Sequence, residues 1–172
     1  TPSMEGTDWV KAVTSAKPYF WPATGVYKGA PLYKVAAIDC GIKWNILRIF
    51  ANLGCEVHVF PAQTTLKEIM AIKPDGLFLS NGPGDPAALG YIIKEIKKML
   101  DKFPIFGICL GHQLLGWAFG GKTYKLKFGH HGGNHPVMNL ANRKVEITTQ
   151  NHGFNVDIKS LDGEEIEITH MN

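Results

Sequence analysis

The 172-residue chain is 45% apolar and 19% charged, which is the composition of an ordinary globular domain, with room for one domain or one domain and a tail. No apolar run approaches the roughly 20 residues of a membrane-spanning helix and no signal peptide is visible, so we expect no membrane partner. The net charge is +3, but the basic residues are scattered, so we expect no nucleic-acid partner.

The first part of the chain, residues 1–32, is polar and interrupted by proline and glycine. We interpret it as a linker or the end of a missing N-terminal domain, with a short helix within 3–15 that starts near Thr7-Asp8. Residues 33–172 carry the regular patterns of a folded domain. The chain begins at Thr1 and ends without a closing element, so we expect it to be a fragment, truncated at its C-terminus.

From residue 33 onward, strand and helix patterns alternate. Apolar or alternating β-rich runs predict strands, and apolar residues spaced by three and four predict helices. The predicted strands are 35–38, 56–60, 76–80 and the run before Cys109. The predicted helices are 46–53, 65–74, 91–100 and the apolar stretch from Cys109 to Gly120-Gly121. This alternation predicts an α/β fold, a doubly wound and mainly parallel sheet with flanking helices. Glu68 is placed to complete a capping box with Thr65.

Beyond Gly121 the pattern becomes mostly β, which predicts extra β elements toward the C-terminus. Strands are predicted at 123–127, 145–149 and 165–170. Two polar segments, 129–136 and 150–154, are rich in glycine, histidine and asparagine, and we predict that they are loops.

The most informative segment surrounds Cys109, between an apolar run and an apolar helix. Gly107 and Gly111 stand two residues to either side, the pattern of a nucleophile elbow, in which small residues let the chain turn sharply from strand to helix. A thiol there lies at the positive end of a helix, so we expect it to lose its proton readily. A buried structural cysteine is the alternative, but it does not explain the two glycines. The odd total of three cysteines favours reduced thiols in a cytoplasmic setting.

A second segment of interest is the loop 81–86, which is dense in glycine and proline and follows the predicted strand 76–80. Loops at the carboxyl ends of parallel strands meet at one edge of the sheet, so this loop and Cys109 can face one pocket. A nucleophile that attacks a carbonyl needs hydrogen-bond donors for the oxyanion. Leu110 and the loop 82–84 can each supply a backbone N–H, although a simple tight turn is an alternative for the loop.

The seven histidines include no evident general base. His130, His131 and His135 form a cluster that could suggest a metal, but no carboxylate or thiol stands near them in the sequence, so we predict no metal site. His152 lies in a candidate binding segment, but the chain has no His-Xaa-Glu or His-Xaa-Asp pair. The sequence indicates a nucleophile without a visible triad, so neither His152 nor His170 is assigned as its base.

These segments together resemble a known family. Residues 107–113 and 80–86 resemble the nucleophile motif and the oxyanion loop of class I (triad-type) glutamine amidotransferases. Residues 128–136 and 150–154 narrow the resemblance to the small, glutaminase subunits of bacterial-type carbamoyl-phosphate synthetases. The likeness extends from about Val35 to Val156 and is dense, which makes it specific.

The resemblance implies that Cys109 attacks the side-chain amide of L-glutamine, forms a γ-glutamyl thioester and releases ammonia, with oxyanion N–H groups from Gly84 and Leu110. It implies a carbamoyl-phosphate synthetase large subunit as the partner, which uses the ammonia with bicarbonate and ATP in the cytoplasm for pyrimidine and arginine biosynthesis. No cofactor is expected in this chain, because ATP and magnesium belong to the partner. The residues implied to line the glutamine site are Gly82, Gly84, Leu110, Gln113, Asn151, Gly153 and Phe154.

The chain departs from the family pattern in two respects. The family's catalytic histidine and glutamate lie in a His-Pro-Glu motif that these residues do not contain, and the family's N-terminal domain is also absent. We therefore expect the fragment to be inactive alone. Two alternatives stay open: a catalytically silent glutaminase-like module that binds or regulates a synthetase, and the amidotransferase subunit of another synthetase, such as one making guanylate or anthranilate. The stretch 130–136 disfavours the second.

Overall fold

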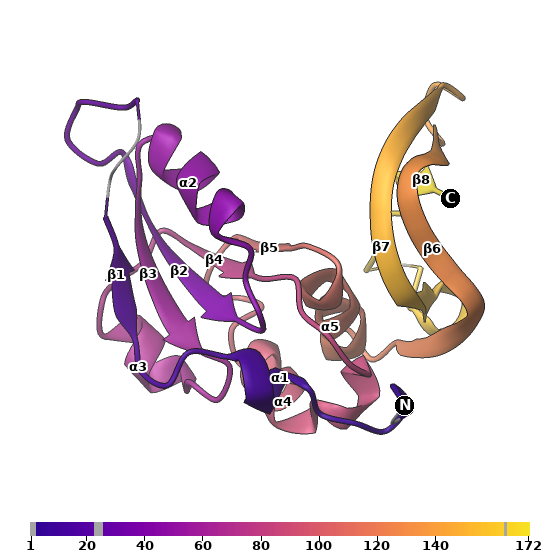
Figure 1. Cartoon of the computed structure of the whole chain (residues 1–172), viewed down its shortest axis with the longest axis horizontal. Coiled ribbons are helices and arrows are strands. Elements are labelled where there is room, and N and C mark those ends of the chain that lie inside the picture. Colours follow the sequence, from indigo (N-terminus) through magenta and orange to yellow (C-terminus); the bar gives the residue numbers. More distant parts are fainter. Residues whose placement is uncertain (1–2, 23–25, 164) are drawn as a thin grey trace.

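A five-stranded sheet in the order β1-β3-β2-β4-β5 organises the structure (Figure 1). The computed structural model describes residues 3–22, 26–163 and 165–172. Neighbouring strands are parallel except β1, which is antiparallel to β3. The strands are β1 (Tyr19–Trp21), β2 (Tyr33–Asp39), β3 (Cys55–Pro61), β4 (Gly76–Leu79) and β5 (Ile105–Gly107). A mainly parallel sheet confirms the predicted α/β fold class.

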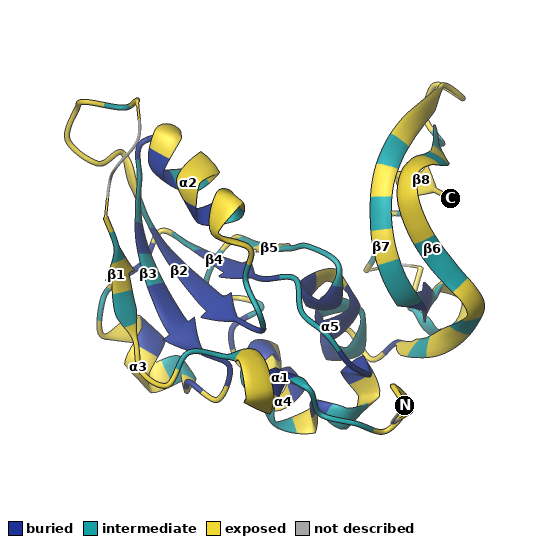
Figure 2. Ribbon diagram, viewed as in Figure 1, coloured by how far each residue is buried: buried dark blue, intermediate teal, exposed yellow. Residues whose placement is uncertain are grey.

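Helices cover both faces of this sheet, which confirms the doubly wound arrangement. The helices of the described chain are α1 (Val10–Val13), α2 (Trp44–Asn52), α3 (Leu66–Met70), α4 (Gly90–Lys97) and α5 (Leu110–Ala118), and the 3₁₀ turns are η1 (Pro86–Ala88) and η2 (Ile158–Ser160). Successive side chains alternate across a strand, so α2 packs on the face that carries Val35 and Ala37, whereas α3, α4 and α5 pack on the face that carries Ala36 and Ile38. The buried central strands lie between these helix layers (Figure 2).

The predicted capping box at the start of α3 is confirmed. Glu68 Oε2 accepts a hydrogen bond of 2.8 Å from the backbone N–H of Thr65, and Thr65 Oγ1 accepts one of 3.4 Å from the backbone N–H of Glu68. The helix ends at Met70, earlier than the predicted end near Pro74. Lys73 adopts a positive φ of 51°, which is incompatible with continued α-helix, so the chain leaves helical geometry before the proline.

Part of the 1–32 segment joins the folded domain. Val10 of α1 is completely buried, and the unpredicted strand β1 pairs with β3 between Pro18 and Pro22. The helix predicted within 3–15 is reduced to the single turn of α1. The interpretation of this segment as a linker or the end of another domain stays a prediction. Within the described part of the chain, no helix has the length and apolar character needed to cross a membrane.

A long hairpin follows the sheet, and Figure 1 shows it beside α5. Its strands are β6 (Lys122–Asn139) and β7 (Val145–Asp157), and β6 also pairs with β8 (His170–Met171). The prediction that 129–136 and 150–154 are loops is therefore wrong, since both segments lie within paired strands. Register shifts in β6 allow these segments, which are rich in glycine, histidine and asparagine, to stay within the paired strands. The strand predicted at 165–170 is also wrong for most of its length, because regular pairing begins only at His170.

The turn from β5 into α5 confirms the predicted sharp reversal from strand to helix at Cys109, whereas the role of Cys109 as a nucleophile stays a prediction. Cys109 has φ 55° and ψ −109°, a conformation that L-residues rarely adopt. A Cβ atom on Gly111 would lie 2.1 Å from the carbonyl oxygen of Leu79, and one on Gly107 would lie 2.6 Å from the carbonyl carbon of Gly111. The two glycines are therefore required by the close approach of α5 to β4 and β5.

Substitution of Gly111 by alanine tests this constraint. We expect Gly111→Ala to lower the free energy of unfolding by about 3 kcal/mol or more, because the new methyl group must displace either β4 or α5. The matched control is Gly90→Ala, since no atom lies within 4 Å of a Cβ there, and its stability should be unchanged or up to about 1 kcal/mol higher. Urea denaturation of both variants provides the measurement, and equal stabilities for the two would contradict the packing argument.

Candidate active site

A cavity of about 490 Å³ lies at the carboxyl ends of the parallel strands and contains Cys109. Its walls come from the segments that follow β2, β4 and β5, together with the middle of β7. The predicted site residues that line it are Cys109, Gly82, Gly84, Gln113, Asn151, Gly153 and Phe154. Leu110 lies buried beside them and contributes through its backbone. The structure thus brings the predicted residues together, although their roles stay predictions.

The thiol of Cys109 is surrounded by backbone groups. The backbone N–H groups of Leu110 and Gly82 lie near the sulfur and favour its thiolate form, and the thiol lies 3.7 Å from the carbonyl oxygen of Asn151. Burial raises the pKa of the Cys109 thiol above its ordinary value, although the two N–H groups and the positive charge of Lys43 act to lower it. The expectation of a readily lost proton is therefore wrong for this structure, because loss of hydration outweighs the helix N-terminus.

The loop after β4 approaches the thiol closely because residue 82 is glycine. A Cβ on Gly82 would lie 2.1 Å from the carbonyl oxygen of Cys40 and 2.8 Å from the Leu110 side chain. Asn81 ties this loop to the segment after β2, since its Nδ2 donates to the carbonyl of Gly41 at 3.0 Å and its Oδ1 accepts from the backbone N–H of Lys43 at 3.1 Å. The N–H of this loop that lies near the sulfur is that of Gly82, so a role for Gly84 as oxyanion donor stays a prediction.

Gln113 attaches the hairpin to the rest of the site. Its side chain is buried, and Nε2 donates a hydrogen bond of 2.8 Å to the carbonyl oxygen of Phe154. A buried amide without a partner costs about 1–3 kcal/mol, so this bond holds the middle of β7 against α5. The position of Asn151, three residues before Phe154, depends on that attachment.

The histidines of the hairpin bind one another and neighbouring carbonyls. His152 Nδ1 lies 2.7 Å from the carbonyl oxygen of Phe154, and its Nε2 lies 2.9 Å from Gln150 Oε1 and 3.3 Å from His130 Nδ1. In the neutral ring, Nδ1–H donates to the Phe154 carbonyl, and Nε2 is the unprotonated nitrogen that can accept a hydrogen bond from His130 Nδ1. Burial lowers the pKa of His152 and the neighbouring histidines lower it further, whereas the hydrogen bond with Phe154 raises it.

Three contributors to the site are absent from the predicted set. Lys43 places a positive charge near the thiol, Asn81 braces the glycine loop, and the His131 ring hydrogen-bonds the Asn151 side chain. Asn81 belongs to the loop that the sequence singles out, and its amide could have been considered there. The contact between His131 and Asn151 depends on strand register, which no local pattern reveals. Among the described residues, no group of three or more His, Cys, Asp or Glu side chains is arranged to hold a metal ion.

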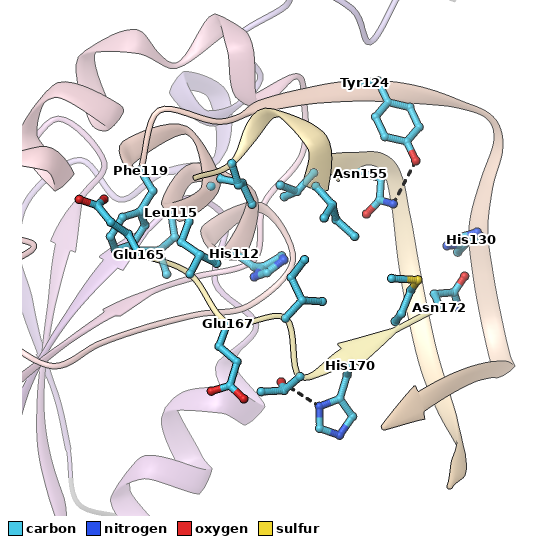
Figure 3. Close-up of a pocket in the computed structure, with 18 of the residues that line it drawn as sticks. His112, Leu115, Phe119, Tyr124, His130, Asn155, Glu165, Glu167, His170 and Asn172 are labelled. Atoms are coloured by element: carbon cyan, nitrogen blue, oxygen red, sulfur yellow. Dashed lines mark hydrogen bonds between the residues drawn. The ribbon is translucent and has the colours of Figure 1, made fainter. Parts of the chain in front are cut away.

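A larger cavity of about 870 Å³ lies between α5, the hairpin and the C-terminal residues (Figure 3). His112, Tyr124 and Asn155 contribute to its wall, and Asn155 Nδ2 donates to the Tyr124 hydroxyl at 3.3 Å. None of the predicted site residues lines it. We therefore place the candidate active site in the smaller cavity, which Cys109 and Gly82 line.

Comparison with known proteins identifies relatives of the chain. Among curated proteins, it is 53% identical to the carbamoyl phosphate synthase small chain of Syntrophotalea carbinolica, over 99% of this chain and 47% of the relative. It is also 53% identical to the carbamoyl phosphate synthase small chain of Chlorobaculum tepidum, over 99% of this chain and 46% of the relative. The chain thus spans about half the length of the curated relatives it matches.

Solved structures show the same fold at low sequence identity. A putative GMP synthase component from Thermoplasma acidophilum has a TM-score of 0.64 at 23% identity, covering 79% of this chain and 71% of that one. A glutamine amidotransferase from Thermotoga maritima has a TM-score of 0.57 at 21% identity, covering 73% and 62%. Residues 36–172 match the family described as glutamine amidotransferase class-I. The chain therefore belongs to the class I glutamine amidotransferase family, as its motifs predict.

Proposed function

We propose that the protein containing this chain hydrolyses the side-chain amide of L-glutamine and delivers the ammonia to a carbamoyl-phosphate synthetase large subunit in the cytoplasm. The observation that carries the proposal is the position of Cys109, which lines a cavity and whose thiol lies near the backbone N–H groups of Gly82 and Leu110. The choice of partner follows the names of the relatives, which are carbamoyl phosphate synthase small chains. The product would then enter pyrimidine and arginine biosynthesis.

The chemistry of an amide and a thiol fits this arrangement. The Cys109 thiolate attacks the amide carbon, and the carbonyl oxygen becomes an oxyanion that can accept hydrogen bonds from backbone N–H groups beside the sulfur. When the carbon–nitrogen bond breaks, the nitrogen takes a proton and leaves as ammonia, and the carbon stays attached to sulfur as a thioester. Water then cleaves the thioester, which releases glutamate and restores the thiol.

The proposed reaction needs a base that removes the thiol proton, because burial raises the pKa of Cys109. His152 is not assigned to this role, because its Nδ1–H donates to the Phe154 carbonyl and its Nε2 lies 3.3 Å from His130 Nδ1 within the hairpin. We therefore propose that a base outside these residues completes the site, and that this chain alone has little activity. No cofactor is proposed for this chain, because ATP and magnesium serve the large subunit.

The proposal is tested with the complete protein and its large subunit. Glutamine should yield glutamate with or without the large subunit, and carbamoyl phosphate only when the large subunit, ATP and bicarbonate are present. Binding of glutamine without glutamate release would instead identify a silent binding module. Activity only with a synthase that makes guanylate or anthranilate would contradict the choice of partner.

Replacement of the nucleophile gives a specific prediction. In the complete protein, we expect Cys109→Ser to lower glutamine hydrolysis at least about 10³-fold, because the thioester cannot form. The matched control is Cys55→Ser, since Cys55 is a free cysteine outside the cavity, and it should retain full activity. Circular dichroism checks that both variants fold. Substantial hydrolysis by folded Cys109→Ser would refute the nucleophile assignment.

The raised pKa of Cys109 predicts how its reactivity depends on pH. Only the thiolate alkylates, so iodoacetamide should modify Cys109 more slowly at pH 7 than it modifies an unperturbed thiol, and the rate should rise with pH to a midpoint above the ordinary thiol value. Lys43→Met removes a positive charge that lowers this pKa, so the midpoint should move to higher pH.

Mass spectrometry of the labelled peptides separates Cys109 from Cys55 and from Cys40, whose pKa is raised to about 12, mainly by burial. Lys127→Met is the matched control, because Lys127 lies over the ring of Phe128 and outside the cavity. A downward midpoint shift in Lys43→Met, or an equal shift in both variants, would show that Lys43 does not act on the thiol.

A further inference from the structure

We infer that His131 is a positioning residue for substrate binding and that it acts through the side chain of Asn151. The inference rests on the proposed function, because the ligand concerned is glutamine. Three features of the hairpin carry it: a hydrogen bond between the two side chains, the strand register that aligns them, and the space that Gly129 leaves for the histidine ring.

The first feature is a direct hydrogen bond in the wall of the cavity. His131 Nδ1 lies 2.7 Å from Asn151 Oδ1, and both residues line the cavity that contains Cys109. An amide oxygen only accepts, so Nδ1 of His131 carries the proton and donates it. The backbone carbonyl of the same Asn151 lies 3.7 Å from the thiol of Cys109. Asn151 therefore connects His131 with the surroundings of the nucleophile.

The second feature is the register of β6 and β7. His131 and Asn151 are direct partners in the antiparallel ladder, within a short paired stretch of 130–132 with 150–152. Register shifts interrupt the ladder on both sides of this stretch. Irregularities of this kind re-aim side chains and are frequent beside active sites. Here they define locally which side chain lies opposite Asn151.

The third feature is the backbone beneath the histidine ring. Gly129 has a positive φ of 72°, and a Cβ there would lie 2.4 Å from His131 Nε2. Any larger residue at 129 would displace the ring from its place. Nε2 of His131 lies over Gly129, and Nδ1 is bonded to Asn151, so contacts within the hairpin hold both sides of the ring. The ring is therefore held where it orients the asparagine amide.

The consequence concerns the direction of the Asn151 amide. While Nδ1 of His131 carries the ring proton, the Asn151 amide cannot turn over without placing two donors against each other. Among the described residues, Asn151 Nδ2 has no hydrogen-bond partner, so its N–H groups are available to an oxygen of the bound glutamine. His131 thereby selects the donor orientation before the substrate arrives, which avoids part of the ordering cost of binding.

Steady-state kinetics of glutamine hydrolysis by the complete protein test this inference. His131→Leu removes the donor and should raise KM for glutamine about five- to tenfold, with kcat changed less than about twofold. His131→Asn places an amide N–H near the position of Nδ1 and should keep KM within about twofold of the unsubstituted value. His170→Leu is the matched control, because His170 is an exposed residue outside this cavity, and it should leave KM unchanged.

A double-mutant cycle separates the positioning role from a direct one. Asn151→Ala should raise KM by itself, and adding His131→Leu should raise it no further, because His131 acts through the lost amide. Additive increases would overturn the inference, as would an unchanged KM in His131→Leu. If His131→Leu fails to fold, judged by circular dichroism, His131→Ala takes its place in the cycle. Absence of turnover in the unsubstituted protein would instead overturn the proposed function.

Discussion

The close contact between the start of α5 and the end of β4 is the constraint on which the rest of the site depends. Only a glycine at 111 lets the helix lie against the carbonyl of Leu79, and only a glycine at 107 lets β5 turn into it. Between the two glycines, Cys109 adopts its unusual backbone conformation, and it lines the cavity at the carboxyl ends of the strands. The strain is local, and the packing of α5 in the core sustains it.

The same contact sets the electrostatics of the thiol. The start of α5 offers the Leu110 N–H, and the glycine loop after β4 offers the Gly82 N–H. Both favour the thiolate, yet burial in the cavity raises the pKa of Cys109 above its ordinary value. The same backbone N–H groups can stabilise the negative charge of an oxyanion as well as that of a sulfur anion. The arrangement is therefore better suited to the charge that develops during a reaction than to a resting thiolate.

The hairpin completes the cavity from a distant part of the sequence. The buried bond from Gln113 to Phe154 holds it against α5, and the paired stretch of 130–132 with 150–152 presents His131 and Asn151 to the cavity. The part of the cavity wall that comes from the parallel sheet and the part that comes from the hairpin are therefore joined at α5. A change in the register of β6 would separate His131 from Asn151 even if every individual strand were retained, because pairing alone places them opposite each other.

The sequence by itself determined the α/β alternation, the capping box of Thr65 and Glu68, and the elbow at Cys109, because each depends on residues close together in the chain. It could not determine that 129–136 and 150–154 lie in paired strands, since bulges keep glycine-rich residues in a ladder only when a partner strand is present. It also could not determine the direction of the Cys109 pKa shift. Burial and strand register are properties of contacts between distant segments, so the tertiary structure alone decided them.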